Sequence, residues 1–332
     1  MKRTYDVAIL GYYGFGNLGD ELLLESVVCL LKANGIRSDR IAVFSASPQE
    51  TSSRLGVSSF DRWNLFEITK VLRSSRSLLL GGGGLFQDVT SSRTCLYYWA
   101  AIRLARILGA KPWTLGQSVG PLKRSMGNFF AKNAFSNCCF CGVRDLRSYE
   151  ILKQWDVKAT LSPDLVMGMK LNMCTSAGSK LLLNLRPGYR NLAEKIIDAA
   201  LDYSRRNKLR ILPVALSDED ADELRELIVS HGAETDEIAV VKSLSDFEHI
   251  AADAGAAIGM RLHFIILSYL PGLRVGAGLY DPKVESFCAR FSIPDICLSL
   301  CLSESCDPHD IAVIRDEVAA VLKSGLTLVS EA

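Results

Sequence analysis

Histidine is scarce in this sequence, because the 332 residues contain only four of them. Long apolar runs are also missing, and the segment from Phe264 to Leu270 is far shorter than the roughly 20 residues that span a bilayer. The formal net charge of +1 excludes nucleic-acid binding through an overall basic field. No internal repeat or low-complexity segment is evident. These absences leave the composition of an ordinary globular enzyme, with 48% apolar and 23% charged residues.

The length and the opening residues indicate two domains and no signal peptide. A chain of 332 residues exceeds the size at which a single core usually stops growing. The opening MKRTYDVAILGYYGFGN superficially looks like a signal peptide, but Asp6 interrupts its apolar region, so we expect a first core strand there. We therefore expect a cytoplasmic protein, and peripheral association at the inner face of the cell membrane stays open.

Ten cysteines raise the question of disulfides or a metal site. The cluster CCFC, residues 138–141, lies inside an apolar run, which favours reduced and buried thiols. A second group near the end of the sequence consists of Cys297, Cys301, Cys306 and His309. Its spacing matches no paired C-x-x-C pattern of a zinc site, so we expect neither a metal nor another cofactor.

Short apolar runs alternate with longer segments of helical spacing along the whole chain, which is typical of a parallel α/β sheet. The predicted strands are YDVAIL, IAVF, SLLL, PWTL and CCFCGV, and then KLLLNL, LRILPVAL, EIAVV, GAAIG and LRVGAG. A polar, glycine-containing shift around residues 166–180 separates the two sets. The sequence therefore predicts two Rossmann-like, doubly wound domains, residues 1–170 and 171–332, facing each other across a ligand-binding cleft.

Three glycine-containing turns follow predicted strands of the first domain. GYYGFGNLGDE leads into a helix and presents backbone N–H groups to an anion, and GQSVGPL follows a later strand. Between them, Gly81 to Gly84 form four successive glycines, which favour close approach by a ligand or by another backbone segment over a simple tight turn. Helix capping by Asp20 is the alternative to ligand contact. The predicted substrate-binding residues here are Gly16, Asn17, Asp20, Gly82, Gly83, Gly84 and Gln117.

Two cations stand where a strand gives way to a helix. Arg144 directly follows the strand CCFCGV, where it could bind a phosphate or carboxylate in a bidentate manner; alternatively it pairs with a nearby carboxylate while Asp145 caps the helix. Lys283 follows Pro282 at a predicted helix start, where a cation opposes the helix dipole. Such placement favours a functional role for Lys283 over simple surface coverage.

The stretch GMRLHF, residues 259–264, contains one of the few histidines. If the strand ends near Gly259 and a helix begins near Leu262, then Arg261 and His263 lie in a turn at the carboxyl end of the strand. A histidine in a helix more often packs or caps than reacts. However, Arg261 is close to His263 in the sequence, and Arg144 and Lys283 occupy equivalent positions after other strands. This pattern predicts a site for a small dianion with an acid or base beside it.

The ordered motifs GYYGFGNLGDE, GGGGLFQD, GQSVGPL, VRD, SPDL, GMRLH and YDPKV resemble the polysaccharide pyruvyl transferase family, specifically its CsaB type. The resemblance covers roughly residues 5–290. It implies two Rossmann-like domains arranged as in GT-B glycosyltransferases, with the acceptor in the first domain and the donor in the second. It also implies transfer of pyruvate from phosphoenolpyruvate to N-acetylmannosamine of a lipid-linked cell-wall polysaccharide precursor, as a 4,6-ketal that S-layer proteins later bind.

The resemblance carries over to individual residues. It implies that Arg144 and Lys283 clamp the donor and that His263 is a general acid and then a base, with Arg261 also binding substrate. Three positions depart from the family pattern: Ser118 replaces a common glycine, Gly188 replaces an expected aromatic residue, and Arg274 replaces a usual proline. These departures affect the acceptor more than the chemistry.

Two other functions remain open on the sequence. The same fold and cations would serve a GT-B glycosyltransferase that uses a nucleotide sugar, or a non-catalytic module that binds anionic glycans. The expected partners of the first interpretation are phosphoenolpyruvate and a lipid-linked saccharide, with transient membrane-surface association and no nucleic acid.

Overall fold

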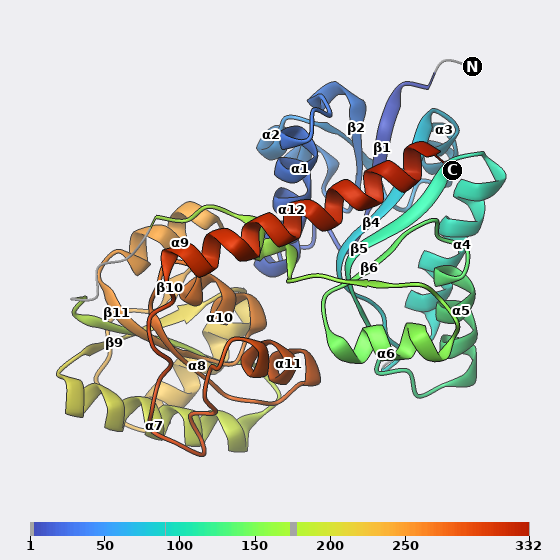
Figure 1. Cartoon of the computed structure of the whole chain (residues 1–332). Coiled ribbons are helices and arrows are strands. Elements are labelled where there is room, and N and C mark those ends of the chain that lie inside the picture. The colour runs from blue at the N-terminus through green and yellow to red at the C-terminus, as the bar shows by residue number, and fades with distance from the viewer. Residues whose placement is uncertain (1–2, 90, 173–177, 332) are drawn as a thin grey trace. The chain divides into compact units, whose positions relative to one another are not determined.

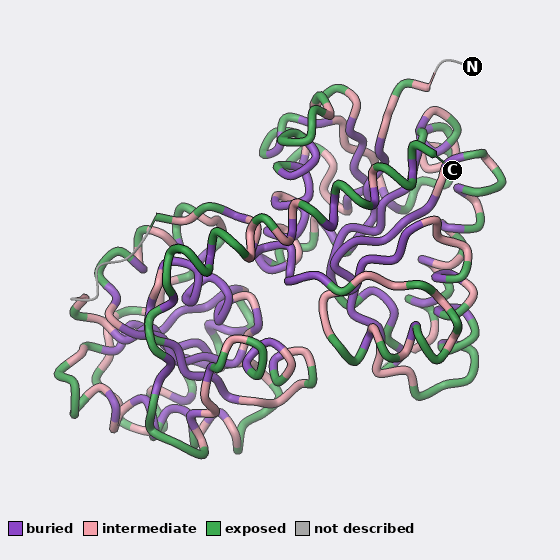
Figure 2. Tube along the Cα trace, viewed as in Figure 1, coloured by how far each residue is buried: buried purple, intermediate pink, exposed green. Residues whose placement is uncertain are grey.

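The computed structural model describes residues 3–89, 91–172 and 178–331 (Figure 1). They form two compact units, which are Met1–Gly168 with Ile314–Ala332, and Met169–Val313. The N-terminal unit holds a seven-stranded parallel sheet and the C-terminal unit a five-stranded one. The strands of both sheets are largely buried (Figure 2), in keeping with their continuous apolar runs.

In the N-terminal unit the strand order is β3-β2-β1-β4-β5-β6-β7. Helices α3 to α6 cover one face of this sheet and pack into one apolar core, whereas α1 and α12 contact the other face. The strands are β1 (Tyr5–Leu10), β2 (Ile41–Ser45), β3 (Ser58–Asp61), β4 (Ser75–Phe86), β5 (Lys111–Val119), β6 (Cys141–Val143) and β7 (Thr160–Leu161). The helices are α1 (Leu18–Ala33), α2 (Pro48–Leu55), α3 (Leu65–Arg73), α4 (Arg93–Ile107), α5 (Ser125–Phe135) and α6 (Leu146–Gln154).

In the C-terminal unit the strand order is β10-β9-β8-β11-β12. Its strands are β8 (Lys180–Asn184), β9 (Arg210–Ala215), β10 (Ala239–Val240), β11 (Ala254–Gly259) and β12 (Arg274–Ala277). Its helices are α7 (Arg190–Asn207), α8 (Asp218–Ser230), α9 (Leu244–Ala251), α10 (Leu262–Tyr269) and α11 (Pro282–Arg290). Two short 3₁₀ helices, Ser38–Arg40 and Leu165–Gly168, complete the elements of the N-terminal unit.

The end of the chain differs from the predicted division at residues 170 and 171. Helix α12 (Pro308–Glu331) contributes its residues from Ile314 onward to the N-terminal unit. The physical reason is that α12 packs against β5. A side chain at Gly325 would meet the ring of Trp113, and Lys111 Nζ donates to the Val329 carbonyl at 2.9 Å. The last helix therefore completes the first core rather than the second.

In each sheet the chain first adds strands on one side of its first strand and then adds the remaining strands on the other side. The place where the direction changes is the switch point of the sheet. This switch point lies between β1 and β4 in the N-terminal unit, and between β8 and β11 in the C-terminal unit. In open parallel sheets, ligands bind beyond the carboxyl ends of the strands at such points. Among the described residues, no helix has the length and apolar composition of a membrane span.

Candidate functional site

The first glycine loop joins β1 to α1 at the switch point of the N-terminal unit. Asn17 caps α1, because its side-chain oxygen accepts from the Gly19 amide at 3.3 Å, and its side-chain nitrogen donates to Asp20 at 2.6 Å. Gly16 is exposed, has a φ of 74°, and has open space where a side chain would be. The cap is therefore Asn17 rather than Asp20, and the tip of the loop is accessible.

The four glycines lie at the end of β4, beside that loop. Gly82 and Gly83 adopt left-handed φ values of 79° and 91°, and added side chains there would meet Leu23 and Asp20 of α1, respectively. Close approach of other parts of the chain thus explains the glycines at these positions. Gly84 differs, since it is exposed and its surroundings are open. Of the predicted glycine contacts in β4, position 84 is the one accessible to a ligand.

Gln117 is fully buried in β5 and binds the glycine strand rather than facing solvent. Its side-chain nitrogen donates to the carbonyls of Leu80 at 3.2 Å and Gly82 at 3.0 Å, while its side-chain oxygen accepts no hydrogen bond from the described residues. The geometry supports a role in holding the β4 glycines in place.

Arg144 lies at the carboxyl end of β6 in a buried ion pair. Its Nη1 is 2.6 Å from Asp164 Oδ2, and its Nε donates to the Ser118 hydroxyl at 2.8 Å. Ser118 in turn donates to Asp145 at 2.6 Å, and Asp145 caps α6 by accepting from the Ser148 amide. The structure therefore has the pairing and the cap that were the alternatives to ligand contact. Ser118 makes two contacts that the glycine common at this position could not make.

Replacing Arg144 with alanine is expected to lower the free energy of unfolding by about 3–5 kcal/mol, because it removes one partner of a buried ion pair and with it the cation that faces the Asp164 carboxylate. Only 6% of the Arg144 side chain and 3% of the Asp164 side chain are exposed. Urea denaturation of the variant and of Arg147→Ala, an exposed arginine on α6, measures the effect. Equal stability of the two variants would contradict the ion-pair account, whereas loss of activity with wild-type stability would favour a donor clamp.

A buried arginine that sequence reasoning missed lies after β3. Arg62 is 2% exposed, donates to the Gly11 carbonyl at 2.5 Å, and forms no ion pair within the described ranges. Its guanidinium carbon lies 5.0–6.0 Å from the ring centroids of four aromatic side chains, and its Nε has no hydrogen-bond partner among the described residues. The four rings belong to Tyr12, Phe15, Trp63 and Tyr97. A desolvated cation thus lies against four aromatic rings, three of which, those of Tyr12, Phe15 and Trp63, are exposed.

The turn that follows β11 places Arg261 and His263 at the switch point of the C-terminal unit. Met260, Leu262 and Phe264 alternate with them and are buried, so the core fixes the turn. A side chain at Gly259 would overlap the Phe264 ring, which explains the glycine. Helix α10 begins at Leu262 as predicted, and its first turn contains no acidic residue. Its N-terminus is suited to an anionic ligand.

Arg261 itself is held by a carboxylate that the sequence did not reveal. Its Nε lies 3.0 Å from each oxygen of Asp220, and Nη2 makes a further contact with the same group. The Asp220 side chain is fully buried, and Asn184 accepts from the Arg261 amide at 3.1 Å. These contacts hold the backbone at Arg261, two residues before His263. Arg261 therefore acts as a positioning residue in this geometry.

Lys283 lies in the first turn of α11, next to the capping residue. Asp281 accepts from the Lys283 amide at 3.0 Å, and its other oxygen lies 3.7 Å from Lys283 Nζ. About a third of the Lys283 side chain is exposed. Because β12 is the neighbour of β11, Lys283 and His263 follow adjacent strands at the same edge of the sheet.

Arg186 is a second missed cation, and it lies two residues after the end of β8, at the switch point. Its guanidinium carbon lies 5.2 Å from the Tyr280 ring centroid, and its buried Nε makes no hydrogen bond with any described residue. Burial raises the pKa of Tyr280, while the charges of Arg186 and Arg261 act in the opposite direction. Both arginines are thus close to the same phenol. Two cations, Arg186 and Lys283, now accompany His263 at this edge.

No group of three or more His, Cys, Asp or Glu side chains in the described part of the chain is arranged to hold a metal ion. The spacing of Cys297, Cys301, Cys306 and His309 therefore does not form such a group. All three cysteines of the CCFC run are free thiols, and the Cys141 side chain is buried.

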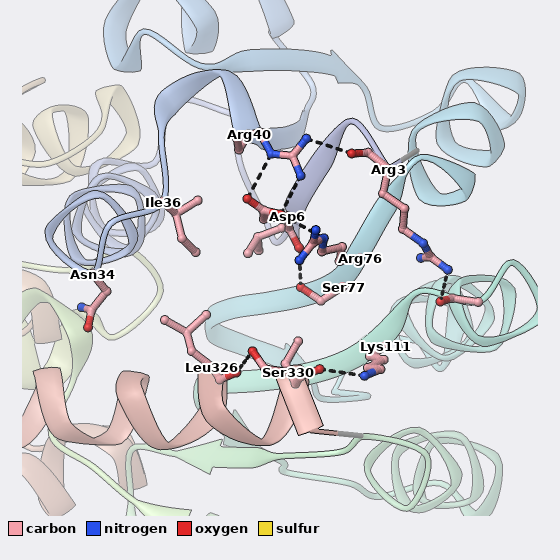
Figure 3. Close-up of a pocket in the computed structure, with 13 residues that line it drawn as sticks. Arg3, Asp6, Asn34, Ile36, Arg40, Arg76, Ser77, Lys111, Leu326 and Ser330 are labelled. Atoms are coloured by element: carbon pink, nitrogen blue, oxygen red, sulfur yellow. Dashed lines mark hydrogen bonds and ion pairs between the residues drawn. The ribbon is translucent and has the colours of Figure 1, made fainter. Parts of the chain in front are cut away.

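A large cavity of about 890 Å³ lies at the opposite, amino-terminal edge of the N-terminal sheet (Figure 3). Its cations are engaged with the protein: Arg40 and Arg76 both contact Asp6, and Arg3 donates to the Gly109 carbonyl at 2.7 Å. These contacts join the first strand to the segments around it. Because ligands of parallel sheets bind at the carboxyl edge, we do not assign the site to this cavity.

The chain has two Rossmann-like units, each with polar or glycine-rich turns at its switch point, and the solved structures it resembles place it in the GT-B fold class. A family model, polysaccharide pyruvyl transferase, matches residues 17–272. The chain therefore belongs to the polysaccharide pyruvyl transferase family, whose name identifies it as a transferase.

Solved structures share this fold at low sequence identity. A UDP-GlcNAc 2-epimerase from Methanocaldococcus jannaschii, in complex with UDP-GlcNAc and UDP, is 9% identical with a TM-score of 0.57, covering 98% of this chain and 100% of that one. A glycosyltransferase from Rickettsia africae is 11% identical with a TM-score of 0.54, covering 99% and 96%. No curated protein matches the chain significantly. These likenesses show the fold alone.

Proposed function

We propose that this protein transfers pyruvate from phosphoenolpyruvate to a sugar as a ketal and releases phosphate, as in the CsaB type. The expected acceptor is N-acetylmannosamine in a lipid-linked cell-wall polysaccharide precursor, modified across its 4- and 6-hydroxyls. The observation that carries the proposal is that Arg186, His263 and Lys283 follow three neighbouring strands, β8, β11 and β12, at the carboxyl edge of the C-terminal sheet. The family match supports the same reaction class.

The proposed reaction sets requirements, and the proposal assigns them to these side chains. A proton must add to C3 of the enol while a sugar hydroxyl adds to C2, and the second hydroxyl then replaces phosphate at C2 to close the ketal. Arg186, Lys283 and the N-terminus of α10 supply positive charge for the donor's carboxylate and phosphate. His263 supplies the proton as a general acid and then accepts one from the attacking hydroxyl.

Replacing Arg186 with glutamine is expected to raise the Michaelis constant for phosphoenolpyruvate by at least about tenfold, because a charged hydrogen bond contributes about 1.5–3 kcal/mol. The matched control is Arg190→Gln at the start of α7, where the arginine is exposed and paired with Glu194 at 3.1 Å. Steady-state phosphate release measures both variants. A Michaelis constant unchanged in Arg186→Gln would remove this residue from the donor site.

The proposal assigns the acceptor sugar to the N-terminal unit, and two stacked aromatic rings there support this assignment. The exposed rings of Tyr12 and Phe15 stack with centroids 4.1 Å apart and an interplanar angle of 12°. They lie within the first glycine loop, where Gly16 and Asn17 are exposed. An aromatic face takes the apolar C–H face of a sugar, while nearby polar groups take its hydroxyls.

Calorimetric titration with phosphoenolpyruvate and with UDP-GlcNAc separates the two enzyme candidates. The proposal predicts saturable binding of phosphoenolpyruvate and none of UDP-GlcNAc. The reverse result would favour a nucleotide-sugar glycosyltransferase, a reading supported by the fold likeness to UDP-GlcNAc-binding proteins. Retained glycan binding without any turnover of phosphoenolpyruvate would favour a binding module instead.

A further inference from the structure

The N-terminal unit exposes large apolar side chains at one edge of its sheet. Phe66 is 76% exposed and Phe129 is 60% exposed. They belong to a set, here called the apolar rim, that consists of Trp63, Leu65, Phe66, Leu96, Met126 and Phe129. Exposed apolar residues are ordinary when scattered but informative when they gather.

The rim occupies the starts of three neighbouring helices. Trp63 precedes α3 and contacts Tyr97 of α4, with ring centroids 5.4 Å apart. Trp99 of α4 donates to Asn133 of α5 at 2.7 Å, and this hydrogen bond joins α4 to α5. Because each helix returns antiparallel to the strand before it, all three starts lie at the carboxyl edge of the sheet.

An apolar cavity opens between the first two of these helices. It has a volume of about 140 Å³ and is lined by apolar side chains of α3, α4 and the sheet, with exposed Leu65 among them. An apolar cavity of about 150 Å³ accommodates a benzene-sized molecule and otherwise stays dry. The cavity therefore has room for a few methylene or isoprene carbons.

Cations accompany the rim where helix dipoles disfavour them. Arg93 begins α4, and Lys123 and Arg124 precede α5; all three are exposed. The first turns of α4 and α5 contain no acidic residue, and Glu67 is the acidic residue in the first turn of α3. Positive charge beside exposed aromatic and aliphatic groups is the composition of a surface that lies on an anionic bilayer.

We propose that the apolar rim docks on the surface of a bilayer that contains anionic lipids. Its apolar side chains enter the interface, an acyl or isoprenoid segment enters the cavity between α3 and α4, and the three cations contact lipid headgroups. The complementary charge favours a bilayer over a second copy of this chain, whose identical rim would bring like charges together. The inference does not depend on the reaction, because vesicle binding needs neither substrate.

The apolar part is tested by flotation of the full chain with vesicles of phosphatidylcholine alone or with one-third phosphatidylglycerol. The wild-type protein is expected to float with the anionic vesicles, and Phe66→Ser to bind them about tenfold more weakly. The control is Ile107→Ser, since Ile107 is also 76% exposed but lies at the other end of α4. Equal binding by both variants, or no binding by the wild type, overturns the proposal.

The electrostatic part is tested with Lys123→Gln and the control Lys132→Gln, an exposed lysine in the last turn of α5. Loss of one surface cation is expected to weaken binding to anionic vesicles about fivefold for Lys123→Gln only. Sedimentation of the wild type completes the test: a dimer that Phe66→Ser dissociates, without vesicle binding, would assign the rim to a second copy. Activity on a soluble acceptor is expected to stay at the wild-type level in Phe66→Ser, so failure of docking and failure of the proposed function are distinguishable.

Discussion

Phosphate release from phosphoenolpyruvate is expected to fall by at least about 100-fold when His263 is replaced with glutamine, because a positioned acid or base commonly contributes 100-fold or more. Glutamine keeps a polar side chain of similar size but cannot exchange a proton. The melting temperature is expected to stay near the wild-type value, since the buried neighbours Leu262 and Phe264 fix the turn.

The control for this variant is His249→Gln, an exposed histidine on α9 of the same unit. It is expected to retain full activity and stability. Full activity in His263→Gln would remove this histidine from the chemistry. A large drop in melting temperature of His263→Gln would instead assign it a packing role.

Lys283→Ala is expected to lower activity by at least about tenfold, because the proposed function assigns to its ammonium group a charge-assisted contact with the donor phosphate. Stability is expected to stay level or rise slightly, since a cation in the first turn of α11 opposes the helix dipole. Melting temperature and phosphate release are measured on the same preparations.

An arginine at this position gives the second arm of the test. Lys283→Arg is expected to recover activity only in part, because a planar guanidinium does not reproduce the contacts of a compact ammonium. If Lys283→Ala releases phosphate at the wild-type rate, the lysine only covers surface at the helix start.

The strand pattern was largely predictable because parallel strands buried on both faces leave continuous apolar runs. All ten predicted runs overlap strands of the two sheets. The two unpredicted strands, β3 and β7, are the outer strands of the N-terminal sheet. The four residues of β3 are all half-buried, and β7 has only two residues, so neither leaves an apolar run.

The position of site residues was predictable where the strand-to-helix rule applied, and their partners were not. The rule located Arg261 and His263, but the pairing of Arg261 with Asp220 depends on tertiary structure, 41 residues apart in the sequence. Asp164, the partner of Arg144, lies in the SPDL motif. This motif is part of the family resemblance, but the sequence did not predict a role for Asp164. The rule that selected Arg144 also selects Arg186, so applying it to every strand end would have found this cation.

The role of the glycines shows a limit of the same kind. A glycine run signals close approach but not what approaches. At Gly82 and Gly83 the approaching groups belong to α1, and at Gly84 the surroundings are open. Only the folded chain distinguishes these two uses of the same residue type.

The most direct test of the proposed function is incubation of the purified protein with phosphoenolpyruvate and a synthetic lipid-linked disaccharide that ends in N-acetylmannosamine. The account predicts release of one phosphate per acceptor and a mass gain equal to one pyruvyl ketal. No such product from this acceptor, with consumption of a nucleotide sugar in its place, would contradict it.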